Sequence, residues 1–247
     1  MIKILGVASG KGGVGKTTVA INLSAALREL GNNNIIIDAD VSNANLSIQL
    51  GFQYIPVTLQ DVLSGNIGIL QAIRIHPTGL RVIPAALSLD SINVDITPLR
   101  KHLEQLNETI ILDFPPGLKE DVTKLMEMTT EILVVTNPEL TAVTEALKTV
   151  EIAKRMKKVV LGIVLNRVRK DKYELRAEEV EEICEVPVLV EIPEDKNVRK
   201  ANFHHMPVIY FNPYAPSSFE YLKLASMLTG QRFTPPRFWK LRRIFRI

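Results

Sequence analysis

The residues most clearly suited to chemistry form a glycine-rich run near the N-terminus, Gly10-Lys11-Gly12-Gly13-Val14-Gly15-Lys16-Thr17-Thr18. An apolar stretch precedes the run and an amphipathic one follows it, so the run connects a predicted strand to a predicted helix. Its glycines allow backbone N–H groups to point inward at a helix N-terminus, which makes a concave site for phosphate. In this Walker A pattern Lys16 contacts the β- and γ-phosphates and the Thr17 hydroxyl binds Mg²⁺. The run therefore predicts a Mg-ATP site.

Acidic residues that could meet the metal follow two other apolar runs. Asp113 comes directly after Ile110-Ile111-Leu112, and Asp38 and Asp40 come after Ile35-Ile36-Ile37. A phosphate loop that binds Mg²⁺ needs such a carboxylate at the end of a neighbouring strand. An aspartate after a strand is by itself often only a turn or cap residue. Its combination with the phosphate loop favours a role at the metal.

A second lysine, Lys11, lies at the front of the loop, where phosphate binding does not require one. By itself it would be a solvated loop residue. However, the run from Lys11 to Thr18 resembles the deviant Walker A signature of the MinD/ParA family of ATPases, particularly the archaeal MinD type. The resemblance covers nearly all of residues 1–229. It implies that two subunits enclose two ATP molecules, with Lys11 reaching the partner's nucleotide and with Lys16 as a second catalytic lysine.

The same resemblance implies roles for the acidic residues. Asp38 and Asp113 would hold Mg²⁺ through water, together with Thr17, and Asp40 would position the water that attacks ATP. The loop after Asp113, Phe114-Pro115-Pro116-Gly117, would move with the γ-phosphate. It departs from the family's usual Asp-x-Pro-Ala-Gly, because a second proline replaces the alanine and stiffens the loop.

The adenine contacts are also predicted mainly from the resemblance. Asn166 and Arg167 end a later apolar run, and ligands of doubly wound sheets bind at the carboxyl ends of the strands. Asn166 would contact the adenine edge, and the segment Ile192-Pro193-Glu194-Asp195 would close over the base. An asparagine after a strand is otherwise an ordinary turn residue.

Alternating strands and helices would position these residues. Most predicted strands are apolar on both faces, which is typical of strands buried on both sides. Strand–helix alternation then predicts an α/β fold with a doubly wound, mostly parallel sheet, the fold of P-loop NTPases of the deviant Walker A type. The predicted strands are Ile2–Ala8, Asn34–Asp38, Leu80–Pro84, Thr109–Asp113, Ile132–Thr136, Val159–Leu165 and Val186–Ile192, and the clearest helices are Thr17–Leu30 and Leu140–Met156.

The positive charge of the chain is concentrated at its C-terminus. The 247 residues carry a net charge of +3, yet residues 230–247 contain six basic residues and no acidic one. The remainder therefore has 24 basic and 27 acidic residues. We expect an ATPase domain at 1–229, a linker at 230–236 and a helix at 237–247, and the charge of that helix points to an anionic partner.

On a helical wheel, Phe238, Leu241, Ile244 and Phe245 fall within an arc of about 120°. The other side carries Lys240, Arg242, Arg243 and Arg246, with Trp239 among them. Three interpretations remain open. The helix could pack back onto the domain, or it could form a basic arm for nucleic acid, which explains the arginines but not the apolar face. A helix lying on a membrane surface explains both features, and MinD proteins end in a similar sequence.

These observations predict a MinD-like ATPase that dimerises on binding ATP, attaches to the membrane and is released on hydrolysis. It would act in spatial regulation such as division-site placement, together with an activating or effector protein. Alternatives are a ParA-like DNA-partition ATPase, a flagellar-placement relative of MinD, or a metabolic ATP-dependent ligase. We expect nucleic acid to be an unlikely partner because of the apolar face of the C-terminal helix.

The composition of the chain excludes several other classes of protein. Cys184 is the only cysteine, which excludes an internal disulfide and a cysteine-held iron–sulfur cluster, so nitrogenase-type reductases are excluded too. The first seven residues are too short an apolar run for a signal peptide, and no stretch approaches the ~20 apolar residues of a membrane-spanning helix. We therefore expect a cytoplasmic protein, peripheral at the inner face of the cell membrane.

Overall fold

The computed structural model describes residues 3–86 and 94–233. Within these residues an eight-stranded sheet has the order β3-β4-β2-β5-β1-β6-β7-β8. All neighbouring strands are parallel except β3, which pairs antiparallel with β4 at one edge. The strands are β1 Ile4–Ala8, β2 Asn34–Asp38, β3 Arg74–Ile75, β4 Arg81–Ile83, β5 Thr109–Asp113, β6 Glu131–Thr136, β7 Val159–Val168 and β8 Val188–Pro193.

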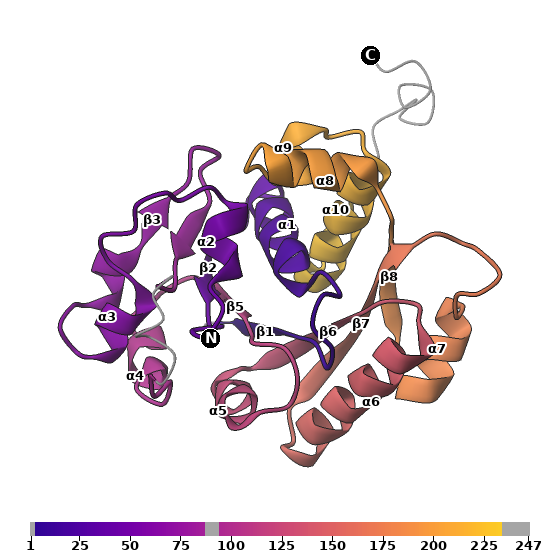
Figure 1. Ribbon diagram of the computed structural model, residues 1–247, viewed down its shortest axis with the longest axis horizontal. Coiled ribbons are helices and arrows are strands. Elements are labelled where there is room, and N and C mark those ends of the chain that lie inside the picture. The colour runs from indigo at the N-terminus through magenta and orange to yellow at the C-terminus, as the bar shows by residue number, and fades with distance from the viewer. Residues whose placement is uncertain (1–2, 87–93, 234–247) are drawn as a thin grey trace.

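Helices cover both faces of this sheet (Figure 1). One face carries α1 Lys16–Glu29, α8 Lys196–Phe203, α9 Val208–Phe211 and α10 Pro216–Thr229. The other face carries α5 Glu120–Met128, α6 Leu140–Arg155 and α7 Ala177–Cys184. Short helices α2 Asn45–Gln49, α3 Leu59–Leu63 and α4 Leu99–Leu103, and the 3₁₀ turn Ile69–Ala72, lie toward the β3 edge.

Side-chain alternation along the strands explains this two-sided packing. Ile36 of β2 packs in the core beneath α1 and α10, whereas its neighbours Ile35 and Ile37 pack in the core beneath α5 and α6. Successive residues of a strand point to opposite faces, so a strand that is apolar throughout must be covered on both sides. The predicted doubly wound, mostly parallel fold is confirmed.

The seven predicted strands all form, with ends shifted by a few residues. The two-residue strand β3 was not predicted, since so short a segment has no periodicity that marks it as a strand. Cys184 lies at the end of α7 and is fully buried.

The described chain beyond α10 stays close to the domain. Gly230 ends this helix in a left-handed conformation with φ of 68°. The ring centroids of Phe233 and Phe219 lie 6.2 Å apart. The predicted C-terminal helix and the last three residues of the predicted linker, 234–236, lie outside the described residues, so the predicted domain limits remain predictions. No helix among the residues described is both long and apolar enough to cross a membrane.

Candidate nucleotide-binding site

The predicted phosphate and metal residues gather at the carboxyl ends of the central strands. β1 lies between β5 and β6, and β2 lies on the far side of β5, so the connections from β1 and from β5 leave in opposite directions. Ligands of doubly wound sheets bind at such a switch point. Asp38 of β2 and Asp113 of β5 stand opposite each other in register, next to the loop that follows β1.

The phosphate loop has the glycines that its backbone requires. Gly13 and Gly15 adopt left-handed φ values of 81° and 92°. A Cβ at Gly10 would lie 2.1 Å from the carbonyl oxygen of Glu145, and one at Gly15 would lie 2.4 Å from the Nδ2 of Asn166. The first contact packs the loop on α6 and the second packs it on the end of β7. No side chain caps α1, so its N-terminus faces the loop as a site for an anion.

Lys16 is ion-paired with Asp113 inside the protein. Its Nζ lies 2.6 Å from Asp113 Oδ1, and both side chains are buried. The other oxygen, Asp113 Oδ2, is buried without a hydrogen-bond partner among the described residues. An unpartnered buried carboxylate oxygen is unfavourable and rare, and oxygen donors of this kind are what Mg²⁺ and its bound waters prefer. Asp113 and the neighbouring Asp38 therefore fit a magnesium ion.

The two aspartates that follow β2 are held by backbone N–H groups. Asp38 accepts hydrogen bonds from the N–H of Leu46 at 3.2 Å and of Asp40 at 3.3 Å, and Asp40 accepts one from Asn43 at 3.1 Å. Burial, and next the charge of Asp113, raise the pKa of Asp38 well above its usual range. Burial also raises the pKa of Asp40. A cation at this position would favour the charged form of both carboxyl groups.

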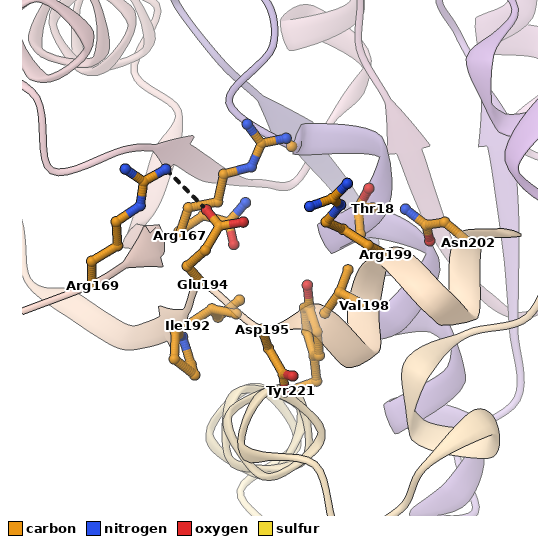
Figure 2. Close-up of a pocket in the computed structure, with 13 residues that line it drawn as sticks. Thr18, Arg167, Arg169, Ile192, Glu194, Asp195, Val198, Arg199, Asn202 and Tyr221 are labelled. Carbon is orange, nitrogen blue, oxygen red and sulfur yellow. Dashed lines mark ion pairs between the residues drawn. The ribbon is translucent and has the colours of Figure 1, made fainter.

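A pocket of about 350 Å³ continues from the phosphate loop between the end of β7, the end of β8 and α8 (Figure 2). This volume is within the range of small-molecule sites. Residues that were predicted to bind the cofactor line it together: Gly15, Thr18, Asn166, Arg167, Pro193, Glu194 and Asp195. The structure therefore brings the predicted base-binding residues to one hollow beside the phosphate loop.

Two of these residues also have structural partners. Asn166 donates from Nδ2 to the Val14 carbonyl at 2.7 Å, which braces the phosphate loop and leaves Oδ1 as an acceptor toward a ligand. The carboxylate of Asp195 caps α8 by accepting from the Asn197 N–H at 2.8 Å, and it also accepts from the Ser217 hydroxyl at 2.9 Å. Asp195 therefore fixes the position of the loop through its side chain.

Several pocket residues were missed by the sequence reasoning. Figure 2 shows Arg169 paired with Glu194 on one side of the pocket, and Arg199 and Asn202 of α8 on the other. The available signal was spacing, because Val198, Arg199 and Asn202 follow Asp195 by three, four and seven residues and so share one face of α8. Tyr221 is the other lining residue that was not predicted, whereas Ile192 belongs to the segment that was predicted to close over the base.

Lys11 lies away from this pocket, at the beginning of α6. Its side chain is exposed, and its Nζ is 3.3 Å from Glu139 Oε2 and 3.4 Å from the Thr141 hydroxyl. The contacts described for Lys11 within one chain are thus with the N-cap residue and the first turn of α6.

Comparison with known proteins agrees with this arrangement. Residues 5–208 match the family model described as the CobQ/CobB/MinD/ParA nucleotide binding domain. An uncharacterized ATP-binding protein of Methanocaldococcus jannaschii is 36% identical over 233 residues, which are 93% of this chain and 88% of that protein. The septum site-determining protein MinD of Synechocystis is 29% identical, over 94% of this chain and 91% of its own.

Two solved structures have the same fold throughout. MinD of Pyrococcus horikoshii, complexed with Mg-ADP, superposes with a TM-score of 0.87 at 32% identity and covers 92% of this chain and 96% of its own. MinD in the MinC:MinD cell division complex of Aquifex aeolicus superposes with a TM-score of 0.84 at 26% identity, over 95% and 98% of the two chains. The chain therefore belongs to the MinD/ParA family of nucleotide-binding proteins.

Proposed function

We propose that this protein is a Mg-dependent ATPase that hydrolyses ATP to ADP and phosphate. The observation that carries the proposal is the buried pair of Lys16 and Asp113, with Asp38 in register beside it and one Asp113 oxygen unpartnered. A lysine and two carboxylates buried at the mouth of a phosphate loop are costly unless a charged ligand uses them. The Mg-ADP complex of the Pyrococcus horikoshii relative supports the same ligand class.

Each residue has a separate part in this mechanism. Lys16 binds the β- and γ-phosphates, and Thr17, Asp38 and Asp113 hold the metal, directly or through water. When bound, Mg²⁺ neutralises charge on the phosphate oxygens. Asp40 orients the water whose oxygen attacks the γ-phosphorus as the bond to ADP breaks. The base lies in the pocket beside Asn166.

The active form in this proposal is an ATP-bound homodimer. Lys11 is exposed and is not needed for the phosphate contacts of its own loop, so it is free to reach across an interface once it leaves Glu139. The partner subunit's Lys11 then adds positive charge at the γ-phosphate. The exposed side chain of Leu140, in the first turn of α6, borders the same surface. The MinC:MinD complex supports a further effector protein.

Attachment to a membrane is the output of this cycle. The basic and apolar residues at 237–247 favour a helix that lies on anionic lipid. One such helix binds weakly, whereas two on an ATP-bound dimer raise the avidity by roughly 10²–10⁴. ATP therefore places the protein on the membrane and hydrolysis releases it, which suits spatial regulation such as division-site placement.

Liposome sedimentation with ATP, with ADP and without nucleotide tests the whole cycle. We expect anionic liposomes to sediment the protein with ATP only, and Lys16→Ala to abolish this by removing nucleotide binding. Lys11→Ala should retain nucleotide but lose dimerisation and sedimentation, whereas Lys148→Ala, which removes another exposed, ion-paired lysine, should behave as the native chain. A Lys11→Ala dimer seen by light scattering would refute the role across the interface. ATP-dependent sedimentation with DNA instead of liposomes would favour the ParA-like alternative.

A further inference from the structure

A second hollow lies next to the C-terminal end of α2. Its volume is about 580 Å³, and three loops that are distant in sequence form it: the segment after α2, the turn between β3 and β4, and the segment between α8 and α9. We call it the aromatic groove. Its lining residues are Leu50, Gly51, Phe52, Gln53, Tyr54, His76, Pro77, Thr78, His204, His205 and Met206.

The walls of the aromatic groove are fixed by contacts between the three loops. The ring edge of Phe52 meets His76 at 5.9 Å between centroids, and a Cβ at Gly51 would lie 2.6 Å from the His205 ring. His76 is buried, its Nδ1 accepts a hydrogen bond from the Thr78 N–H at 3.2 Å, and burial lowers its pKa. Packed side chains therefore form the walls of the groove, and His76 is one of them.

Exposed apolar side chains lie in the lining of the groove or on residues close to the lining in the sequence. Tyr54 in its lining is 81% exposed, and Phe203, beside His204, is 80% exposed. Ile75 next to His76 is 72% exposed, and Ile48 on α2 is 58% exposed. Single exposed apolar residues are normal, but a group around one hollow marks an interaction surface.

The chain around the groove has almost no negative charge. The 27 acidic residues of the protein include one between residues 41 and 81, Asp61, and none between 196 and 215. The Asp61 carboxylate is already used at the start of α3, where it accepts from the N–H and the hydroxyl of Thr58. The same two stretches contain five basic residues, of which Arg81 is paired with Glu108 and Arg199 lines the nucleotide pocket. Arg74, Lys196 and Lys200 are the basic residues that remain. A complementary partner is thus acidic as well as apolar.

Helix α2 connects the groove to the nucleotide site. The Thr18 hydroxyl of the phosphate loop donates to Gln49 Oε1 at 2.9 Å, and Gln49 directly precedes Leu50 of the groove. At the other end of α2, the Leu46 N–H donates to Asp38. If a phosphate group accepts a hydrogen bond from the Thr18 hydroxyl, that hydroxyl no longer donates to Gln49. A shift in the position of the Asp38 carboxylate would act on the other end of the same short helix.

We propose that the aromatic groove binds an acidic segment of a partner protein through aromatic or aliphatic side chains, and that nucleotide binding changes its affinity. An extended or helical segment carrying leucine or phenylalanine between acidic residues matches the hollow, its exposed apolar rim and its basic surroundings. The nucleotide dependence rests on the proposed function, whereas the binding surface does not.

The probe is a short fluorescent peptide of Glu, Leu and Phe, compared with a peptide in which Lys replaces each Glu. Fluorescence anisotropy with the full chain should show binding of the acidic peptide only. Tyr54→Ala should weaken it at least about tenfold, as expected for a central aromatic contact. Tyr173→Ala is the matched control, because Tyr173 is 83% exposed on the loop before α7, and it should have no effect. Equal binding of the two peptides, binding of neither, or equal effects of the two substitutions would overturn the proposal.

The nucleotide dependence is measured with the same probe. Peptide affinity should differ at least about threefold between nucleotide-free and ATP-loaded protein, and Gln49→Ala should remove the difference. A fluorescent ATP analogue monitors nucleotide binding separately, so loss of the ATP site is distinguished from loss of the coupling. If the native chain binds the analogue but its peptide affinity does not change, the coupling is refuted. If Tyr54→Ala instead alters dimerisation or liposome sedimentation, a second copy or lipid occupies the groove and the proposal fails.

Discussion

Replacing Asp38 by asparagine should stabilise the nucleotide-free protein while weakening its binding of Mg-ATP. Asp38 is fully buried at the end of β2, opposite Asp113 in register, and its ionised form is therefore unfavourable without a cation. Asparagine has nearly the same shape but carries no charge. Its Oδ1 can still accept the hydrogen bond from the Leu46 N–H, so the backbone around α2 keeps its main tether.

The expected gain in the free energy of unfolding follows from the interactions of the Asp38 carboxylate. Burial penalises the charged carboxylate by several kcal/mol, and repulsion from Asp113 across one strand spacing of ~5 Å adds about 3 kcal/mol at an effective dielectric constant of about 20. Attraction to Lys16 offsets a similar amount, and losing the bond from the Asp40 N–H costs about 1 kcal/mol. Binding a proton also relieves part of this penalty in the native chain. We therefore expect Asp38→Asn to raise the free energy of unfolding by about 1–2 kcal/mol, or the melting temperature by about 2–8 °C.

Urea denaturation of both proteins without nucleotide, between pH 4 and pH 8, measures this gain. A folded-state pKa raised above the unfolded value of about 3.9 leaves stability unaffected at low pH and lowers it as pH rises toward the folded pKa. The advantage of Asp38→Asn should therefore vanish near pH 4 and grow with pH. Asp61→Asn is a control of the same chemistry, and it should destabilise because Asp61 only caps α3. A loss of stability in Asp38→Asn, or a gain independent of pH, would refute the reasoning.

Three further predictions concern single side chains. Asp195→Ala should cost about 1–3 kcal/mol in urea unfolding, since it removes bonds to Asn197 and Ser217, and an unchanged midpoint would mean that the carboxylate has no structural role. Burial lowers the pKa of His76, so as pH falls the unfolded state binds a proton at this residue before the folded state does, and stability decreases below about pH 6.5. His76→Gln should therefore make the melting temperature less dependent on pH between pH 7.5 and pH 5. An unaltered pH dependence would contradict this. Burial raises the pKa of Cys184 to about 11, so mass spectrometry should find it unalkylated by iodoacetamide at pH 8 until urea is added.

The fold could be predicted because strand and helix signals were long and consistent. Runs such as 35–37 and 110–112 are apolar at every position, which only a strand covered on both faces tolerates. The edge strand β3 was beyond reach, because two residues carry no pattern and their pairing depends on the turn at Pro77–Gly79. The order of the strands also came from the structure, since strong strand signals do not state which strands are neighbours.

The candidate site also has residues that could be predicted from the sequence and residues that could not. The phosphate loop and the aspartates at 38 and 113 were predictable, since their chemistry requires particular residues at particular places along the chain. The pocket residues Arg169 and Arg199 were not, because an exposed arginine at the end of a strand or on a helix is ordinary in sequence. The aromatic groove was equally hidden, because its three loops are far apart in the chain and meet through contacts such as those of Phe52 with His76 and of Gly51 with His205.

The contacts of the phosphate loop suggest why one ligand can affect several parts of the molecule. Three donors on or beside the loop are paired with acceptors on three different elements: Lys16 with Asp113 at the end of β5, Thr18 with Gln49 on α2, and Lys11 with Glu139 before α6. Each donor that turns to phosphate must leave its acceptor, whether the phosphate belongs to its own subunit or to a partner. Under the proposed function, this exchange would alter the loop after β5, the helix beside the aromatic groove and the start of α6 together. A nucleotide site whose donors are paired with three different elements is suited to a switch, because its occupancy would change surfaces that other molecules can contact.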